Sequence, residues 1–202
     1  MTTESSRRNI RTGKKYSAIV IGLSSGGMDA LKMLILAVPP DFDLPIIICQ
    51  HLSPFSDSQW IDIIGKNCAI NVKEADEKEK IFNKNIYIAP PNYHLLIESD
   101  HTFSLTIDPR ESYARPSIDV LFQSAAFAYG PQLVGVVLTG SNHDGAAGLT
   151  QIRDCGGLCL VEDPKTAFSS YMPAAAMAVA APHYVLELRD LINFLIEIDS
   201  QN

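Results

Sequence analysis

Two segments near the start of the chain are apolar at almost every position: residues 17–22 read SAIVIG and residues 44–51 read LPIIICQH. A strand with one face in water alternates apolar and polar residues, whereas a strand buried on both faces is apolar throughout. Because both faces of such a strand must be covered, these segments predict parallel strands in a sheet that lies between two layers of helices.

Helical patterns separate these strands from one another and from the segments that follow. Residues 26–37 carry apolar side chains at a helical spacing, and residues 93–108 form a hairpin pattern that turns near Ser99–His101. The other elements alternate in the same way, with strands expected at 70–75, 85–90, 132–139, 158–163 and 184–188 and helices at 56–66, 115–130, 144–157, 173–181 and 189–198. The alternation predicts a three-layer, doubly wound, Rossmann-like α/β fold whose mostly parallel sheet carries one antiparallel hairpin excursion.

Composition and charge exclude several classes of protein. The formal net charge is −7, whereas a general nucleic-acid binder needs a basic face. Basic residues predominate only at the start, so we expect a flexible basic tail over residues 1–16 and one domain over residues 17–198. No apolar run reaches the roughly 18 residues of a membrane helix, which predicts no membrane insertion. Four cysteines without a CxxC pair indicate a reduced, cytoplasmic protein.

Chemically capable side chains follow three of the expected strands. Ser24 and Ser25 follow the first strand, His51 ends the second, and Asp144 lies in the loop after strand 132–139. In a doubly wound sheet the functional site lies where the carboxyl ends of the strands converge. Serine, histidine and aspartate at one sheet edge are the components of a nucleophilic triad, in which histidine takes the serine proton and aspartate orients the histidine.

A nucleotide site is the less favoured interpretation of the glycine-rich turn. A dinucleotide fingerprint needs glycine two residues after Gly22, but this chain has Ser24 there, whose side chain would crowd a pyrophosphate. The second strand ends in His51 rather than in an acidic residue that would bind a ribose. No Lys-Ser or Lys-Thr pair follows the glycines, so the turn also lacks the P-loop pattern.

Each candidate residue also has a structural interpretation. Ser24 or Ser25 would cap the first helix, Asp144 would cap the helix that follows it, and His51 would be a structural residue at a strand end. Pro116 is expected at the first position of helix 115–130, where a missing N–H does no harm. The residues alone leave these interpretations open beside the triad.

The order of several motifs resembles the catalytic domain of CheB, the chemoreceptor protein-glutamate methylesterase. The resemblance extends over residues 17–197, and the ordered set of motifs is far more specific than any one of them. It rests on the segments IGLSSGG, CQHLSP, VKEA, IYIAPPNYHLL, RPSIDVLFQSAA, GVVLTGSNHDGAAGL and YMPAAAM.

The resemblance implies a serine esterase with Ser24 as nucleophile, His51 as base and Asp144 as the orienting acid. The family hydrolyses glutamate γ-methyl esters on chemoreceptor helices, releasing methanol, and its members also deamidate particular receptor glutamines. No metal or cofactor is implied, and the partner is a methyl-accepting chemoreceptor. Backbone N–H groups of Ser25 and Ser141 are the candidates for the oxyanion hole.

Other residues of the motifs receive lesser roles. Arg115 either begins a helix as a surface residue or attracts the acidic receptor surface that flanks the ester. His94 and residues 171–173 are interpreted as structural or rim positions. His143 has no second ligand at metal spacing and is interpreted as loop surface.

The chain also departs from the family pattern. Many members read T-G-M-G-x-D-G before the aspartate, but Ser141 and Asn142 stand here for the methionine and the second glycine. We expect asparagine to replace glycine because it enters left-handed conformations more easily than most residues. The usual enzyme carries a phospho-receiver domain before the catalytic domain, whereas this sequence predicts a catalytic domain alone. Its activity is then expected to be constitutive or to be controlled by a partner. The alternative is an adaptor of the same fold that binds receptors without catalysis.

Overall fold

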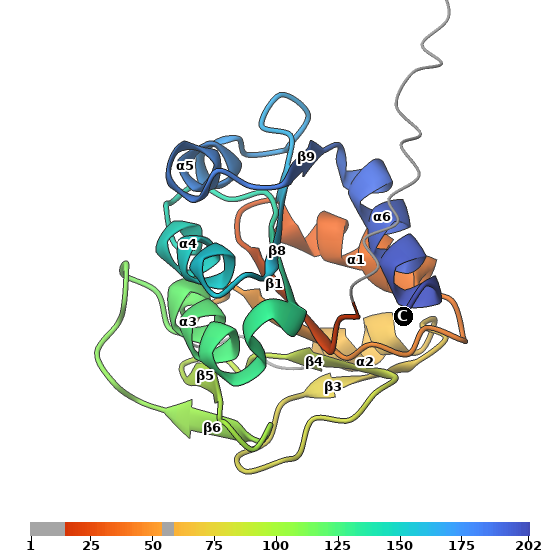
Figure 1. The fold of residues 1–202 in the computed structure, drawn as a ribbon. Coiled ribbons are helices and arrows are strands. Elements are labelled where there is room, and N and C mark those ends of the chain that lie inside the picture. Colours follow the sequence, from red (N-terminus) through yellow and green to blue (C-terminus); the bar gives the residue numbers. More distant parts are fainter. Residues whose placement is uncertain (1–14, 54–58) are drawn as a thin grey trace, which may run out of the picture.

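The computed structural model describes residues 15–53 and 59–202 (Figure 1). Seven parallel strands form one sheet in the order β3-β4-β2-β1-β7-β8-β9. The strands are β1 (Ala18–Leu23), β2 (Ile46–Gln50), β3 (Asn71–Glu74), β4 (Asn85–Ile88), β7 (Leu133–Val137), β8 (Leu158–Glu162) and β9 (Tyr184–Leu186).

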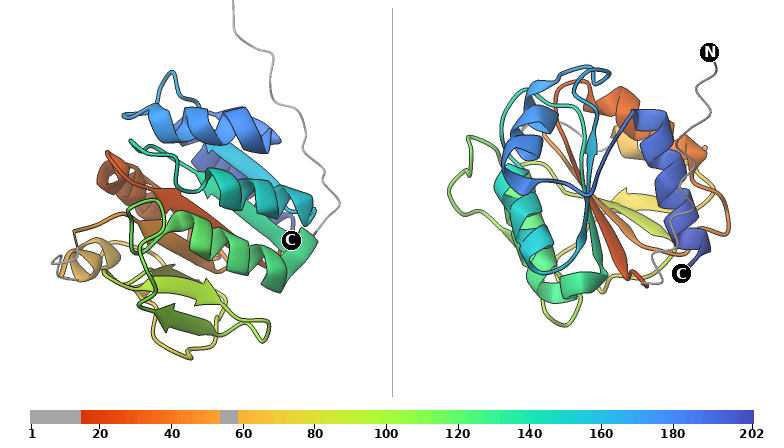
Figure 2. Two further views of the ribbon diagram at one scale, coloured as in Figure 1. Left: turned by 90° about the vertical axis from the view of Figure 1, so that its left-hand side faces the viewer. Right: turned by 45° about the horizontal axis from the view of Figure 1, so that its top comes forward.

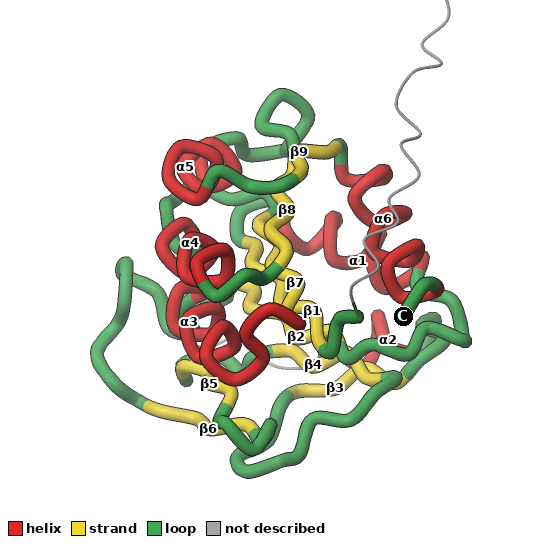
Figure 3. Tube along the Cα trace, in the orientation of Figure 1, coloured by secondary structure: helices red, strands yellow, loops and turns green. Residues whose placement is uncertain are grey.

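Helices cover both faces of this sheet, which confirms the predicted three-layer α/β fold (Figures 2 and 3). One layer contains α1 (Gly27–Ala37), α2 (Gln59–Gly65) and α6 (Leu188–Ser200). The other contains α3 (Ile118–Tyr129), α4 (Ala146–Asp154) and α5 (Tyr171–Ala180), and a short 3₁₀ helix (Gly130–Gln132) leads from α3 into β7. The predicted hairpin is also present, as the antiparallel pair β5 (His94–Ile97) and β6 (Phe103–Thr106) beside α3.

The central strands are buried on both faces, as their apolar sequences predict. In β1, Ile19 and Ile21 pack into the core under α1 and α6, whereas Ala18 and Val20 pack into the core under α3 and α4. All of these side chains are fully buried. Full burial of one isoleucine contributes about 1.5–3 kcal/mol, so the two cores together provide the main force that holds the three layers.

The connections after β1 and β7 leave the sheet toward opposite layers. The chain runs from β1 into α1 on one face, and from β7 into α4 on the other (Figure 1). Since β1 and β7 are adjacent strands, a crevice is expected between their carboxyl ends, and open α/β sheets bind ligands at such switch points. Ser24 and the loop of residues 139–145 follow these two strands directly.

The start of α3 differs from the sequence prediction. Pro116 was expected at the first helical position, but α3 begins at Ile118 and Ser117 is its N-cap. The Ser117 side chain accepts a hydrogen bond from the Val120 N–H, which satisfies one of the free donors of the first turn. Proline therefore precedes the capped turn instead of opening it.

Two other predictions concern residues at the limits of the structure. The predicted tail of residues 1–16 lies mostly outside the described residues, as do the first positions of predicted helix 56–66, which is seen as α2 from Gln59. Within residues 15–53 and 59–202, no helix is both long and apolar enough to cross a membrane.

Candidate active site

The chain turns from β1 into α1 through Ser24, Ser25 and Gly26. Gly26 has φ 78°, a left-handed conformation that glycine adopts without the steric penalty of other residues. Gly26 is also the N-cap of α1, and no side chain makes a capping hydrogen bond there. The alternative interpretation, in which Ser24 or Ser25 caps the first helix, is therefore wrong, and both hydroxyls are available for other contacts.

Gln50, the last residue of β2, fixes the serine turn relative to the loop after β2. Its side-chain amide donates to the backbone carbonyl of Ser24 at 3.1 Å and to that of His51 at 2.8 Å. A Cβ atom on Gly27 would collide with the side-chain carbonyl of Gln50, so this close approach requires glycine. The buried Gln50 side chain thus fixes the position of Ser24 relative to His51.

The imidazole of His51 lies between the Ser24 hydroxyl and the Asp144 carboxylate. His51 Nδ1 is 3.2 Å from Ser24 Oγ, and His51 Nε2 is 2.7 Å from Asp144 Oδ2. The side chain of His51 is 12% exposed and that of Asp144 is 0% exposed. The structure thus brings together the three residues that the resemblance implies as a triad, from the carboxyl ends of β1, β2 and β7.

Asp144 accepts hydrogen bonds from the first turn of α3 as well as from His51. Its Oδ1 accepts from the Ser117 hydroxyl and the Asp119 N–H, both at 2.9 Å, and its Oδ2 accepts from the Ile118 N–H at 2.8 Å. Burial by itself raises the pKa of this carboxyl, but the hydrogen bonds from the imidazole and from α3 outweigh burial and lower the pKa. The ionised carboxylate accepts the Nε2 proton, so the Nδ1 lone pair faces the serine hydroxyl.

Asp144 and Asp119 cap each other's helices. The alternative interpretation of Asp144 as a cap of the helix that follows it is wrong: Gly145 is the N-cap of α4, and Asp144 binds α3 instead. Asp119 returns the contact, because its Oδ1 accepts from the N–H groups of Gly145 at 2.9 Å and Gly148 at 2.6 Å. Burial, with a smaller contribution from the negative charge of Asp144, raises the pKa of Asp119 to about 6 despite these donors.

The raised pKa of Asp119 predicts a pH-dependent contribution to stability. The folded state holds this proton more tightly than the unfolded state, whose pKa is about 3.9. The contribution is therefore fully present below about pH 4 and is lost as the pH rises through 6. Relative to Asp119→Asn, which does not ionise, the parent protein should lose about 1 kcal/mol of unfolding free energy between pH 5 and pH 7.5. Urea unfolding at both pH values measures this difference, and a pH-independent difference would contradict the assignment.

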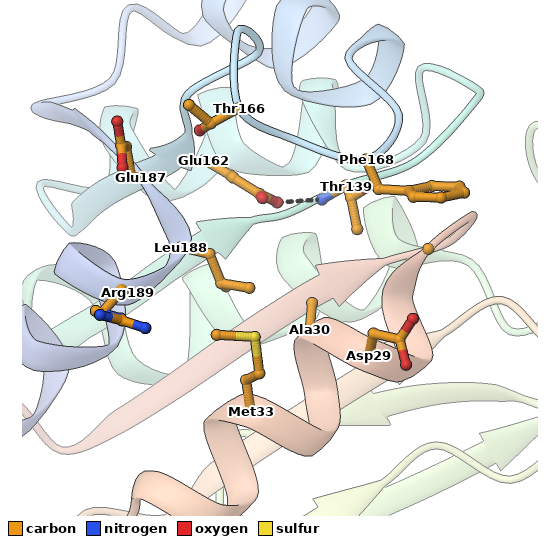
Figure 4. A pocket seen from close by; sticks show the side chains of 11 residues that line it. Asp29, Ala30, Met33, Thr139, Glu162, Thr166, Phe168, Glu187, Leu188 and Arg189 are labelled. Carbon is orange, nitrogen blue, oxygen red and sulfur yellow. Dashed lines mark hydrogen bonds between the residues drawn. The ribbon is translucent and has the colours of Figure 1, made fainter.

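Thr139, which lies shortly after β7, makes two hydrogen bonds to the serine turn. Its carbonyl accepts from the Ser24 N–H at 2.9 Å, and its hydroxyl donates to the Ser25 carbonyl at 2.8 Å. The Thr139 N–H donates to Glu162 Oε2 at 2.8 Å, beside a cavity of about 390 Å³ (Figure 4). Burial raises the pKa of Glu162, and the N–H of Thr139 opposes that change.

Ser25 and Ser141 bring the turn after β1 against the loop after β7. Their hydroxyl oxygens are 2.8 Å apart. The backbone N–H groups of these two serines donate to no atom within the described ranges. Backbone N–H groups without an internal acceptor beside a nucleophile can bind the negatively charged oxygen of a tetrahedral intermediate.

A cavity of about 280 Å³ lies beside His51, lined by residues 110 and 112–116 together with Leu52 and Asn142. Arg115 lies half-buried on this lining. Its guanidinium donates to the carbonyls of Ile107 at 2.6 Å and Asp108 at 3.0 Å, and to Asn92 Oδ1 at 2.9 Å. Arg115 therefore holds the loop that forms the cavity wall, a role that the sequence did not indicate.

Several other motif residues support the loops around the site. His94 is buried; its Nδ1 accepts a hydrogen bond from the Ser117 N–H, and its Nε2 contacts the Pro109 carbonyl. These contacts agree with its interpretation as a structural residue. Met172 is buried and its N–H donates to the Gly140 carbonyl at 2.9 Å, while the neighbouring Tyr171 is exposed. These residues fix the walls of the site and do not reach Ser24.

Sequence analysis missed several residues of the site. The capping role of Asp119 and the two hydrogen bonds from Gln50 to the serine turn and His51 were not predicted. Glu162 was not considered as a residue of the site. Serine after a proline and before a helical pattern is an N-cap signal that could have located the start of α3. No pattern in the sequence indicated which carboxylate that helix start would bind.

His143 and the acidic residues of the site do not form a metal centre in this structure. His143 is exposed, and its Nε2 lies 3.4 Å from the Ser112 hydroxyl. Over residues 15–53 and 59–202, no group of three or more histidine, cysteine, aspartate or glutamate side chains is arranged to hold a metal ion.

Comparison with known proteins identifies the family. Residues 19–195 match the CheB methylesterase family. A candidate protein-glutamate methylesterase/protein-glutamine glutaminase of Leptospira interrogans is 48% identical over 187 residues, which are 93% of this chain and 97% of that protein. The protein-glutamate methylesterase/protein-glutamine glutaminase of Thiobacillus denitrificans is 37% identical over 97% of this chain and 55% of its own length.

A solved structure has the same fold. The crystal structure of the Thermotoga maritima CheB methylesterase catalytic domain superimposes with a TM-score of 0.86 at 29% sequence identity. The superposition covers 92% of this chain and 100% of that domain. Family match, relatives and fold agree, and the chain belongs to the CheB methylesterase family.

Proposed function

We propose that this chain hydrolyses the γ-methyl esters of glutamate residues on methyl-accepting chemoreceptors and releases methanol. The observation that carries the proposal is the hydrogen-bonded series of Ser24, His51 and Asp144 in a member of the CheB methylesterase family. The names of the relatives give the reaction and add the deamidation of glutamine as a second activity. A nucleotide-binding function is not favoured.

In the proposed first step, Ser24 Oγ attacks the ester carbonyl carbon while its proton passes to His51 Nδ1. The carbonyl oxygen becomes an oxyanion, for which the backbone N–H groups of Ser25 and Ser141 are the proposed donors. Asp144 stays ionised and stabilises the imidazolium through Nε2, as its lowered pKa requires. No metal or cofactor takes part in this step.

In the second step, the tetrahedral intermediate collapses and the methoxide oxygen takes the proton from His51 Nδ1. Methanol leaves and Ser24 remains esterified to the glutamyl carbonyl. A water molecule then gives a proton to His51 and attacks this acyl group, which restores Ser24 and releases a glutamate carboxylate. With a glutamine substrate the leaving group is ammonia, and the same residues produce the same carboxylate.

The substrate reaches this site as a side chain of a protein. We propose that residues 17–198 act as one catalytic domain in the cytoplasm, where methylated chemoreceptor helices are the partner. Arg115 lies on the cavity beside His51 and supplies positive charge toward an acidic receptor surface. The proposal implies neither nucleic-acid binding nor membrane insertion.

Methanol release from a methylated chemoreceptor preparation tests this function. The parent protein should release methanol, and Ser24→Ala should lower the rate by about 10³-fold or more, because removing the nucleophile disables the whole unit. Ser200→Ala, which removes an exposed serine on α6, is the matched control and should keep the parent rate. Receptor preparations that a known methylesterase demethylates establish that the substrate is competent.

The adaptor alternative predicts a different result in the same assay. If the parent protein binds the receptor as tightly as Ser24→Ala does but releases no methanol above background, the proposed esterase function is wrong. If release occurs and disappears in Ser24→Ala, a purely binding function is excluded.

A further inference from the structure

Asn142 contacts the same nitrogen atom of His51 that Ser24 contacts. The Asn142 Nδ2 atom lies 3.3 Å from His51 Nδ1, and Ser24 Oγ lies 3.2 Å from it. The orientation of the asparagine amide is fixed, because its Oδ1 accepts the Asp144 N–H at 3.2 Å. The group that faces the imidazole is therefore the NH₂, which can only donate.

His51 Nδ1 has one lone pair in the plane of the ring. Because the ionised Asp144 accepts the Nε2 proton, this lone pair is the only acceptor that the neutral imidazole presents. Ser24 must donate to it for its proton to be transferred during attack. The Asn142 amide and the Ser24 hydroxyl thus compete for one acceptor.

The contact between Asn142 and the imidazole becomes unfavourable once the serine proton has moved to Nδ1. The protonated ring carries an N–H at Nδ1, and the Asn142 NH₂ then faces a second donor without an acceptor between them. Asn142 therefore stabilises the neutral imidazole and disfavours the imidazolium that the reaction forms.

We propose that Asn142 is a positioning residue that restrains His51, holding the ring through Nδ1 and weakening it as a base until the amide moves away. The proposal rests on the esterase function proposed above and adds a control point within that site. The family pattern described in the sequence analysis has glycine at this position, so members with that pattern lack the contact. The expectation that Asn142 adopts a left-handed backbone conformation is wrong, because Asn142 is not among the described residues with positive φ. A left-handed backbone therefore does not explain the asparagine at this position.

Other charged groups around the imidazole do not produce the same effect. Asp144 contacts Nε2 directly, and Asp119 adds negative charge behind it. Two arginines line the cavity beside the ring, and the buried Cys49 thiol has a raised pKa, mainly from burial, and stays neutral. Among all these groups, only Ser24 and Asn142 contact Nδ1.

The pH–rate profile of ester hydrolysis tests the restraint. Asn142→Ala removes the competing donor, and loss of one such hydrogen bond corresponds to about a two- to ten-fold increase in kcat/KM. The acidic limb of the profile, which reports protonation of the base, should move to higher pH. His143→Ala removes the exposed neighbouring side chain and should leave both quantities unchanged.

A second variant separates the restraint from a structural role. Asn142→Asp keeps the acceptor for the Asp144 N–H but presents a carboxylate oxygen to Nδ1, which stabilises the imidazolium. Its acidic limb should move further upward than that of Asn142→Ala, and its rate at neutral pH should fall. If Asn142→Ala lowers kcat/KM and leaves the acidic limb in place, Asn142 only supports the loop and the proposal is wrong.

A measurement without substrate keeps the test independent of the esterase function. NMR titration of the His51 ring in Ser24→Ala, compared with Ser24→Ala/Asn142→Ala, follows protonation when asparagine is the only donor of the pair at Nδ1. The pH of half-protonation should rise when Asn142 is removed. An unchanged midpoint overturns the restraint, whereas failure of methanol release alone overturns only the proposed reaction.

Discussion

Asp144→Asn is expected to lower kcat for ester hydrolysis by about 10³- to 10⁴-fold. The asparagine side chain has one acceptor oxygen where the carboxylate has two, so its NH₂ must face at least one backbone N–H in either orientation. If the carbonyl stays on Ser117 and the Asp119 N–H, the NH₂ meets His51 Nε2. The imidazole then loses its Nε2 proton and carries one at Nδ1, so it can no longer accept the Ser24 proton.

The same substitution tests whether Asp144 also holds α3. Its amide would leave the buried Ile118 N–H facing a donor, which should reduce the unfolding free energy by about 1–3 kcal/mol in urea titrations. Asp154→Asn removes an equal charge from the exposed end of α4 and should change neither activity nor stability. Activity of Asp144→Asn within tenfold of the parent would contradict the assigned orientation of His51.

Asp119→Ala is expected to produce the largest loss of stability among the site variants, about 2–4 kcal/mol of unfolding free energy. The substitution leaves the N–H groups of Gly145 and Gly148 buried without an acceptor at the start of α4. The cap of α3 by Asp144 remains in this variant, so the loss falls on the start of α4, which packs against α3. Denaturant unfolding of the parent and the variant at pH 7.5 measures the loss.

Asp119→Asn is the control for this prediction. Its side-chain oxygen can still accept from both glycine N–H groups, so its unfolding free energy at pH 7.5 should stay at or above that of the parent. If alanine and asparagine at position 119 give equal stability, the capping of α4 by the Asp119 side chain does not contribute to folding.

The location of the site was predictable because it depends on strand order and residue type. Apolar strands at 17–22 and 44–51 indicate a covered parallel sheet, and in such a sheet the residues after each strand meet at one edge. Topology therefore brings Ser24, His51 and Asp144 to the same edge of the sheet. The resemblance then assigned each of them a role, and the geometry is consistent with it.

The contacts within the site depend on packing between segments that are distant in sequence. Asp144 caps α3 instead of its own helix because α3 and α4 approach closely: a Cβ atom on Gly148 would lie 2.5 Å from Phe122 Cβ. Arg115 begins a helical pattern in the sequence, but the fold directs its guanidinium to the carbonyls of residues 107 and 108. Local patterns contain no information on such contacts.

Labelling with a serine-directed fluorophosphonate tests the central claim, that His51 activates Ser24 as the nucleophile. Intact-mass and peptide analysis should find one adduct in the parent and in Ser25→Ala, none in Ser24→Ala, and a much slower reaction in His51→Ala. An adduct that persists in Ser24→Ala, or one that disappears only in Ser25→Ala, would contradict the account.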